Sequence, residues 1–88
     1  MKHIEEISKI INGMNTSKEI HNFLLELLTE SEVETISKRW CIVKMLIENR
    51  TQRDIAKALN VSLCKVTRGA KILKNKNSVI KKYLKKEI

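Results

Sequence analysis

Residues 51–69 read TQRDIAKALNVSLCKVTRG, and their side-chain sizes match two helices joined by a tight turn. Ile55 and Leu59 fall four residues apart, so both lie on the inner face of the first helix. Ala56 lies where two helices that cross steeply at close range leave little room for a side chain. The first half of the stretch is therefore typical of the opening helix of a helix-turn-helix.

The turn and the second helix follow the same pattern. Asn60 occupies a turn position that often adopts a left-handed backbone, which asparagine tolerates best after glycine. Val61 would fill the turn, and Ser62 is expected to cap the second helix. Val66 would then point back at the first helix. Together these features predict a helix-turn-helix over residues 51–72, with a plain helical hairpin as the alternative.

Positive charge is concentrated in the second half of the chain. Residues 1–49 carry six Lys or Arg and eight Asp or Glu, a net charge of −2, whereas residues 50–88 carry twelve and two, a net charge of +10. Such segregation favours a polyanionic partner and makes affinity fall with salt. The cations expected at phosphates or bases are Arg50, Arg53, Lys57 and Lys65. Two roles are equally compatible with the sequence for four lysines of the last helix: contact with phosphate, or a charged face that only keeps the protein soluble. They are Lys81, Lys82, Lys85 and Lys86.

Length and composition limit the other possibilities. Eighty-eight residues suit one domain (residues 1–88) whose core is marginal without association. No signal-peptide pattern is present and no apolar run approaches the ~20 residues of a membrane span, so a cytoplasmic protein without membrane contact is expected. Cys41 and Cys64 are far from each other and from both histidines, which predicts no metal site and two buried thiols, although Cys64 could also touch DNA.

The chain is predicted to be all-α, because it has no proline, two glycines and no stretch of alternating polarity. Capping signatures are expected to start the second and third helices, at Thr16 with Glu19 and at Thr29 with Glu32. The third helix is apolar over more of its circumference than a surface helix needs. It is expected to be either the central helix of the domain or a helix covered by a second copy of the chain, and the small size of the chain favours the second copy. The predicted organisation is dimerisation helices in residues 1–49, the helix-turn-helix in residues 51–72 and a C-terminal helix in residues 76–88.

The end of the second motif helix suggests a ligand site. A helix-turn-helix usually places an apolar side chain there, whereas Gly69 has none and is expected to leave a slot. Arg68 borders the slot with a planar guanidinium that can stack on an aromatic ring. A second arginine such as Arg39 could hold a carboxylate through two hydrogen bonds. A small aromatic carboxylate would satisfy both arginines.

Residues 27–74 resemble the tryptophan repressor family. The resemblance rests on LLT at residues 27–29, Arg39 ten residues later, IV at residues 42–43, QR at residues 52–53, TRG at residues 67–69 and LK at residues 73–74. The most specific combination is TRG at the end of a helix-turn-helix together with the upstream arginine.

The resemblance implies a six-helix, intertwined homodimer that presents two recognition helices to successive major grooves of double-stranded operator DNA. The grooves lie about one helical turn apart, the spacing known for dimeric helix-turn-helix proteins including this family. Leu63 and Cys64 differ from what the family commonly carries, which leaves the operator sequence open. The residues expected at the DNA are Gln52, Arg53, Ser62, Leu63, Cys64, Lys65 and Thr67.

The resemblance also implies L-tryptophan as corepressor, held between Arg39 and Arg68 with clearance provided by Gly69. Main-chain carbonyls near Glu26 and Leu28 of the partner subunit, beside Thr29, would receive its ammonium group. The family commonly has a serine for this ammonium where the chain has Ile72, which accepts no hydrogen bond. Water could replace the hydroxyl. Otherwise the pocket would prefer an indole acid without an amino group, or the response to ligand would be lost.

The function expected is a sequence-specific DNA-binding transcriptional repressor that controls tryptophan biosynthesis or uptake genes. The alternative is a DNA-binding protein of the same fold that needs no ligand or responds to a different indole or aromatic compound. An enzyme is not expected, because His3 and His21 are isolated and no nucleophile is paired with a base. RNA binding is disfavoured because no aromatic platform for stacked bases is visible.

Overall fold

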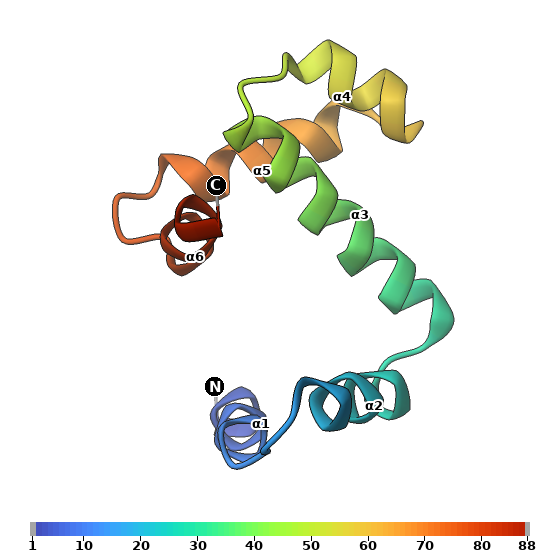
Figure 1. Cartoon of the computed structure of the whole chain (residues 1–88). Helices are drawn as coiled ribbons and strands as arrows, with labels where there is room; N and C mark the ends of the chain where they lie inside the picture. Colours follow the sequence, from blue (N-terminus) through green and yellow to red (C-terminus); the bar gives the residue numbers. More distant parts are fainter. Residues whose placement is uncertain (1, 88) are drawn as a thin grey trace. The chain divides into compact units, whose positions relative to one another are not determined.

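The computed structural model describes residues 2–87, and within them the chain has six helices and no strand (Figure 1). This confirms the predicted all-α class. The helices are α1 (Lys2–Asn12), α2 (Ser17–Leu27), α3 (Glu30–Ile47), α4 (Gln52–Leu59), α5 (Leu63–Lys74) and α6 (Val79–Glu87).

Contacts divide the chain into two compact units, one ending at Val33 and the other beginning at Glu34. The division falls inside α3. The first unit contains α1 and α2. The second contains most of α3 and all of α4, α5 and α6, so the whole predicted helix-turn-helix and the helix that supports it lie in one unit.

The first unit keeps its apolar side chains accessible. Thr16 caps α2 as predicted, because its Oγ1 accepts the main-chain N–H of Glu19 at 3.1 Å. Neither α1 nor α2 has a buried residue, and Ile4 and Ile10 are more than half exposed. The apolar stripes of these two helices therefore remain available for further burial.

A two-way capping box starts α3. The main-chain N–H of Thr29 donates to Glu32 Oε1 at 2.8 Å, and the N–H of Glu32 donates to Thr29 Oγ1 at 3.1 Å. This confirms the predicted signature and satisfies two N–H groups that the helix leaves free. The helix ends at Ile47, and Asn49 then adopts a left-handed backbone with a φ of 66°. Asparagine takes this conformation at helix ends more readily than other non-glycine residues.

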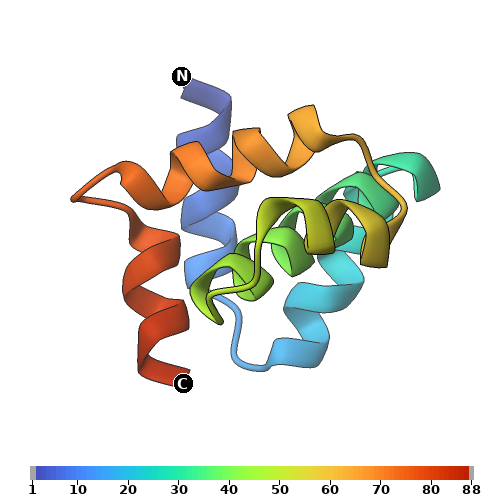
Figure 2. The same ribbon diagram turned by 90° about the horizontal axis from the view of Figure 1, so that it is seen from above.

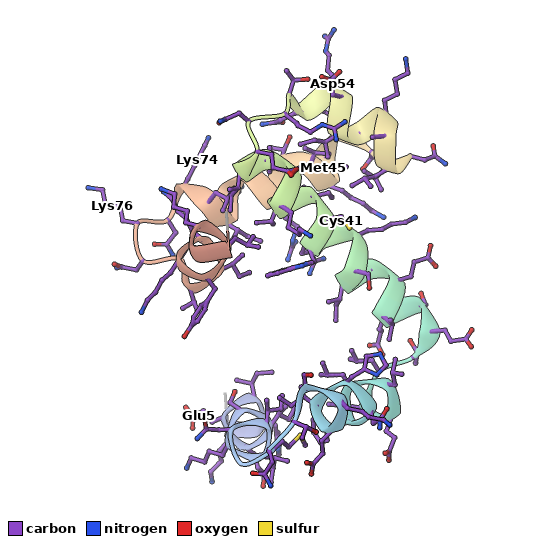
Figure 3. All side chains as sticks on the ribbon, viewed as in Figure 1. Glu5, Cys41, Met45, Asp54, Lys74 and Lys76 are labelled. Atoms are coloured by element: carbon purple, nitrogen blue, oxygen red, sulfur yellow. The ribbon has the colours of Figure 1, made fainter. Side chains whose placement is uncertain are left out.

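The core of the second unit lies where α3, α4 and α5 meet. Ile42, Ile55 and Val66 form one buried cluster, each at most 2% exposed. Partly buried side chains surround it, and Figure 3 labels one of them, Met45, on α3. The inward positions predicted for the two motif helices are therefore confirmed. The surrounding residues are Met45, Leu46, Ala56, Leu59 and Val61.

The last helix begins at Val79, three residues after the boundary expected for the segment 76–88. Ser78 sets this start, because its Oγ accepts the main-chain N–H of Lys81 at 3.1 Å and so occupies the cap position. The residues just before it form the turn through which α5 leads into α6 (Figure 2). Ile88, expected in this helix, lies outside the described residues.

Both cysteines are exposed, so the expectation of buried thiols is wrong. Cys41 precedes two consecutive buried residues of α3, Ile42 and Val43, and successive residues of a helix point in different directions. Cys64 lies two residues before Val66, which is buried, and therefore faces away from the core. The positions of the neighbouring core residues decide the exposure of both thiols.

Candidate nucleic-acid interface

The α4–α5 unit, defined as residues 51–74, turns at a left-handed residue. Asn60 has φ 52° and ψ 52°, and its main-chain N–H donates to the carbonyls of Ala56 and Lys57. The N–H of Val61 also donates to Ala56, at 3.0 Å. The predicted conformation of Asn60 is confirmed, and these bonds satisfy carbonyls that the end of α4 would otherwise leave open.

Hydroxyl caps fix the first residue of each helix in the unit. Thr51 Oγ1 accepts the main-chain N–H of Asp54 at 3.2 Å, and Ser62 Oγ accepts that of Lys65 at 3.3 Å. The cap at Ser62 was predicted and is confirmed. As a result, Gln52 opens α4, and the first turn of α5 carries three of the side chains expected at the DNA, Leu63, Cys64 and Lys65.

The two faces of α5 differ in burial. Val66 and Gly69 are buried, Val66 in the cluster with Ile42 and Ile55 and Gly69 against α3, whereas Leu63 is 49% exposed although it is large and apolar. All the side chains expected at the DNA are exposed and therefore lie at the surface. Their role in DNA binding stays a prediction. They are Gln52, Arg53, Ser62, Leu63, Cys64, Lys65 and Thr67.

Two of these side chains are joined across the unit. Thr67 Oγ1 on α5 donates to Gln52 Oε1 on α4 at 3.1 Å. The bond holds an otherwise flexible glutamine against α5 on the exposed side of the unit. Sequence spacing gave no signal of this pair, because fifteen residues separate the partners.

The sequence that contains α5 and most of α6 carries many cations and no acidic residue. No Asp or Glu occurs between Asp54 and Glu87, and ten Lys or Arg residues fall in that interval. Lys74 and Lys76 project away from the turn after α5 (Figure 3). With no acidic side chain between Asp54 and Glu87, this interval has the positive potential that attracts a polyanion.

The slot expected behind Gly69 is filled by the protein itself. A Cβ added at Gly69 would lie 2.7 Å from Ile42 Cγ2 and 3.7 Å from Leu46 Cδ1. The expectation of an empty slot at this glycine is therefore wrong in this structure, because the missing side chain lets α5 approach α3 and the methyl group of Ile42 takes the space. A glycine at such a position serves close helix packing.

The open space near Arg68 is instead a groove of about 1100 Å³ along the outer side of α5. Arg68 and Ile72 line it together with Val79 and Ile80 from the first turn of α6, and Lys65 and Lys71 add further cations. The groove therefore joins apolar walls to a positively charged edge. This combination suits an apolar molecule that carries a carboxylate.

The other residues expected to bind ligand lie elsewhere. Arg39 is half-buried on α3, one turn before Ile42, and is not among the residues of the groove. Glu26 and Thr29 are exposed and Leu28 is half-buried, all in the first unit. Only Arg68 and Ile72 of the predicted set share the groove, and the ligand role of the whole set stays a prediction.

Residues 2–88 match the family model described as Trp repressor protein. The chain belongs to the Trp repressor family. Trp repressors are DNA-binding regulators of transcription and not enzymes.

Similar chains carry the name Trp operon repressor homolog. The one from Xylella fastidiosa strain 9a5c is 36% identical over 85 residues, covering 96% of this chain and 90% of its own length. The one from Chlamydia caviae is 35% identical over 78 residues (88% and 77%), and the one from Chlamydia trachomatis serovar D is 34% identical over 80 residues (90% and 85%). No solved structure gave a significant match.

Besides the pair of Thr67 and Gln52, two further features were missed from the sequence. The left-handed Asn49 could have been found, because an asparagine shortly after the last apolar residue of a helix, here two residues after Ile47, is a stop signal. The part of the groove formed by Val79 and Ile80 could not have been found from the sequence, because it depends on the direction that the turn after α5 gives to α6.

Other kinds of site find no support in the described residues. Within residues 2–87, no group of three or more His, Cys, Asp or Glu side chains is placed to hold a metal ion. In the same range, no helix is both long and apolar enough to span a bilayer.

Proposed function

We propose that the chain is a sequence-specific transcriptional repressor that acts in the cytoplasm on genes of tryptophan biosynthesis or uptake, with L-tryptophan as corepressor. In this proposal the α4–α5 unit is the helix-turn-helix and α5 enters the major groove of the operator. One observation carries it: α5 buries Val66 and Gly69 on one side and exposes Cys64, Lys65 and Thr67 on the other. A helix of this kind is held firmly while its free side reads base edges.

A homodimer is part of the proposal. Only five hydrophobic residues are fully buried among those that the structure describes, whereas large apolar side chains such as Ile36, Trp40 and Tyr83 are 43% to 57% exposed. A second copy that covers these residues would supply the burial that a chain of this length lacks. Two-fold symmetry would then place two recognition helices on one side of the dimer.

Loss of one phosphate contact should be visible in the salt dependence of binding. Arg53→Gln removes an exposed cation beside Gln52. If Arg53 neutralises a phosphate, we expect the slope of log affinity against log salt to become shallower by about one unit. Fluorescence anisotropy with a labelled DNA duplex at several salt concentrations measures this slope.

The control for this experiment is Lys18→Gln, which removes the same charge from α2 in the first unit and should leave the slope unchanged. Equal slopes for Arg53→Gln and the wild type would show that Arg53 touches no phosphate. Absence of duplex binding by the wild-type protein at low salt would contradict the proposed function itself.

L-tryptophan is proposed as corepressor on the strength of two arginines. The guanidinium of Arg68 lies at a groove with apolar walls, and Arg39 lies on the face of α3 that carries Ile42. The names of the relatives in Chlamydia and Xylella agree with a tryptophan-linked role. Ligand bound beside α5 would favour the orientation of α5 that fits the operator, which shifts the population toward the binding form.

A second candidate is favoured by a specific contact. Because Ile42 fills the space beside Gly69, the protein's own atoms already hold α5 on α3 without a ligand. The alternative is therefore a repressor of this family that binds DNA without a ligand, or one that takes an indole acid without an amino group in the cationic groove. Ile72, which offers no acceptor to an ammonium group, favours the indole acid over the amino acid.

Calorimetry separates these candidates. We expect Arg68→Gln to weaken binding of L-tryptophan or indole-3-propionate by about tenfold, because the indole ring loses the guanidinium on which it would stack. Lys44→Gln removes the same charge from α3 and should have no effect. If the protein releases or absorbs heat on mixing with indole-3-propionate but not with L-tryptophan, the ligand is an indole acid and not the amino acid. If neither compound gives a heat signal, the protein is a repressor that binds DNA without a ligand.

A corepressor must also obey reciprocity. If L-tryptophan strengthens DNA binding by some factor, DNA must strengthen L-tryptophan binding by the same factor. Equal ligand affinity with and without DNA would rule out the corepressor role even if the ligand binds.

A further inference from the structure

The hydrogen bond between Thr67 and Gln52 links two helices through exposed side chains. Thr67 Oγ1 lies 3.1 Å from Gln52 Oε1 and 3.0 Å from the main-chain oxygen of Leu63, so one hydroxyl has two acceptors within reach. A threonine hydroxyl has a single proton. The acceptor that receives it determines how the glutamine amide is turned.

Of the two acceptors, Oε1 of Gln52 depends more on the hydroxyl proton of Thr67 than the carbonyl of Leu63 does. The helical pattern already supplies the carbonyl of Leu63 with the main-chain N–H of Thr67, whereas Oε1 of Gln52 is exposed and has this hydroxyl as its donor. When the hydroxyl donates to Oε1, the amide oxygen is turned toward α5 and the NH₂ group away from it. No acceptor within residues 2–87 takes up this NH₂ group.

An outward NH₂ group suits a DNA phosphate. Phosphate oxygens only accept hydrogen bonds, and glutamine is one of the residues that commonly donate to them. A free glutamine loses rotamer freedom when it binds, and holding the side chain beforehand reduces that loss.

We infer that Thr67 is a positioning residue that acts on DNA through Gln52, by holding the amide so that its two N–H groups face a phosphate. The inference rests on the proposed DNA binding of the α4–α5 unit and assigns Thr67 an indirect role in place of a contact of its own. Because Gln52 is uncharged, this contact displaces no counterion, so its loss lowers affinity without changing the salt slope.

The test is a double-mutant cycle with a fluorescein-labelled DNA duplex of mixed sequence. Phosphate contacts act on every sequence, so the operator is not required. Thr67→Val keeps the shape and removes the hydroxyl, and we expect it to weaken binding about three- to tenfold with a parallel salt dependence. Thr67→Ser restores the hydroxyl and should recover most of the affinity.

The cycle is completed with Gln52→Leu. In that background Thr67→Val should cause no further loss, because the residue through which Thr67 acts is gone. Ser8→Ala is the control: Ser8 is an exposed helical residue whose hydroxyl donates to the carbonyl of Ile4, on its own helix, at 2.8 Å. Its removal should leave DNA affinity unchanged.

A direct measurement accompanies the affinities. The side-chain amide signals of Gln52 in a ¹H–¹⁵N spectrum of the free protein should shift in Thr67→Val and stay near their original positions in Thr67→Ser. Equal melting temperatures for the variants would show that the fold is intact, as expected for a bond between exposed groups.

Two results would overturn the inference. If the losses from Thr67→Val and Gln52→Leu simply add, Thr67 contacts DNA independently of Gln52. If Thr67→Val leaves the affinity unchanged, Thr67 has no role. Both results require a wild-type protein that binds the duplex, whereas failure of the wild type to bind would contradict the proposed function instead.

Discussion

Replacing Gly69 by valine is expected to lower the free energy of unfolding by about 3 kcal/mol or more, at the upper end of the cost of overpacking a core. The first added atom would lie 2.7 Å from Ile42 Cγ2. That methyl group cannot move aside easily, because Ile42 is 2% exposed and a β-branched side chain has few χ1 rotamers. Chemical denaturation followed by circular dichroism measures the loss, and DNA affinity should fall with it because α5 is displaced from α3.

Two variants make this result specific. Gly13→Val should change stability by less than about 0.5 kcal/mol, because a Cβ at Gly13 would meet only main-chain oxygens at 3.6 and 3.8 Å. Ile42→Ala combined with Gly69→Val should cost less than the two single changes together, because the first removes the atoms with which the second collides. Full additivity of the two losses would contradict direct contact between these positions.

Truncation of Ile55 to alanine is the second large effect expected. Ile55 is fully buried in the cluster with Ile42 and Val66, and removing its side chain should cost about 2 to 5 kcal/mol through reduced burial and the cavity that remains. Small domains have only about 5 to 15 kcal/mol in total. The same denaturation experiment should therefore show a large loss, with part of the protein unfolded at room temperature.

Leu63→Ala is the matched control for this prediction, because Leu63 is also a large aliphatic residue of the α4–α5 unit but is 49% exposed. Its truncation should cost less than about 0.5 kcal/mol of stability. A similar loss for both variants would mean that the cluster at Ile55 is not the centre of the core.

Local geometry of the α4–α5 unit could be predicted well from the sequence. The left-handed Asn60, the cap at Ser62 and the inward positions of Ile55 and Val66 all depend on residues within a few positions of one another. Backbone preferences and helical spacing decide such features, and both can be seen in a single sequence.

Features that depend on contacts between distant segments could not be predicted. Gly69 was correctly identified as unusual, but whether its missing side chain leaves a slot or admits Ile42 is decided by the distance between α5 and α3. The link from Thr67 to Gln52 and the groove beside Arg68 depend in the same way on helix placement. The exposure of both cysteines followed from neighbouring core residues and not from the polarity of the thiol.

The left-handed backbone at Asn60 limits how α4 and α5 can move relative to each other. A non-glycine residue in the left-handed region has far fewer alternative conformations than glycine would have, and two main-chain carbonyls hold its N–H. The angle between α4 and α5 is therefore stiff, and the pair is expected to swing as one rigid body. Any change in the orientation of α5 must then be absorbed on either side of the pair, at Asn49 after α3 and in the turn before Val79.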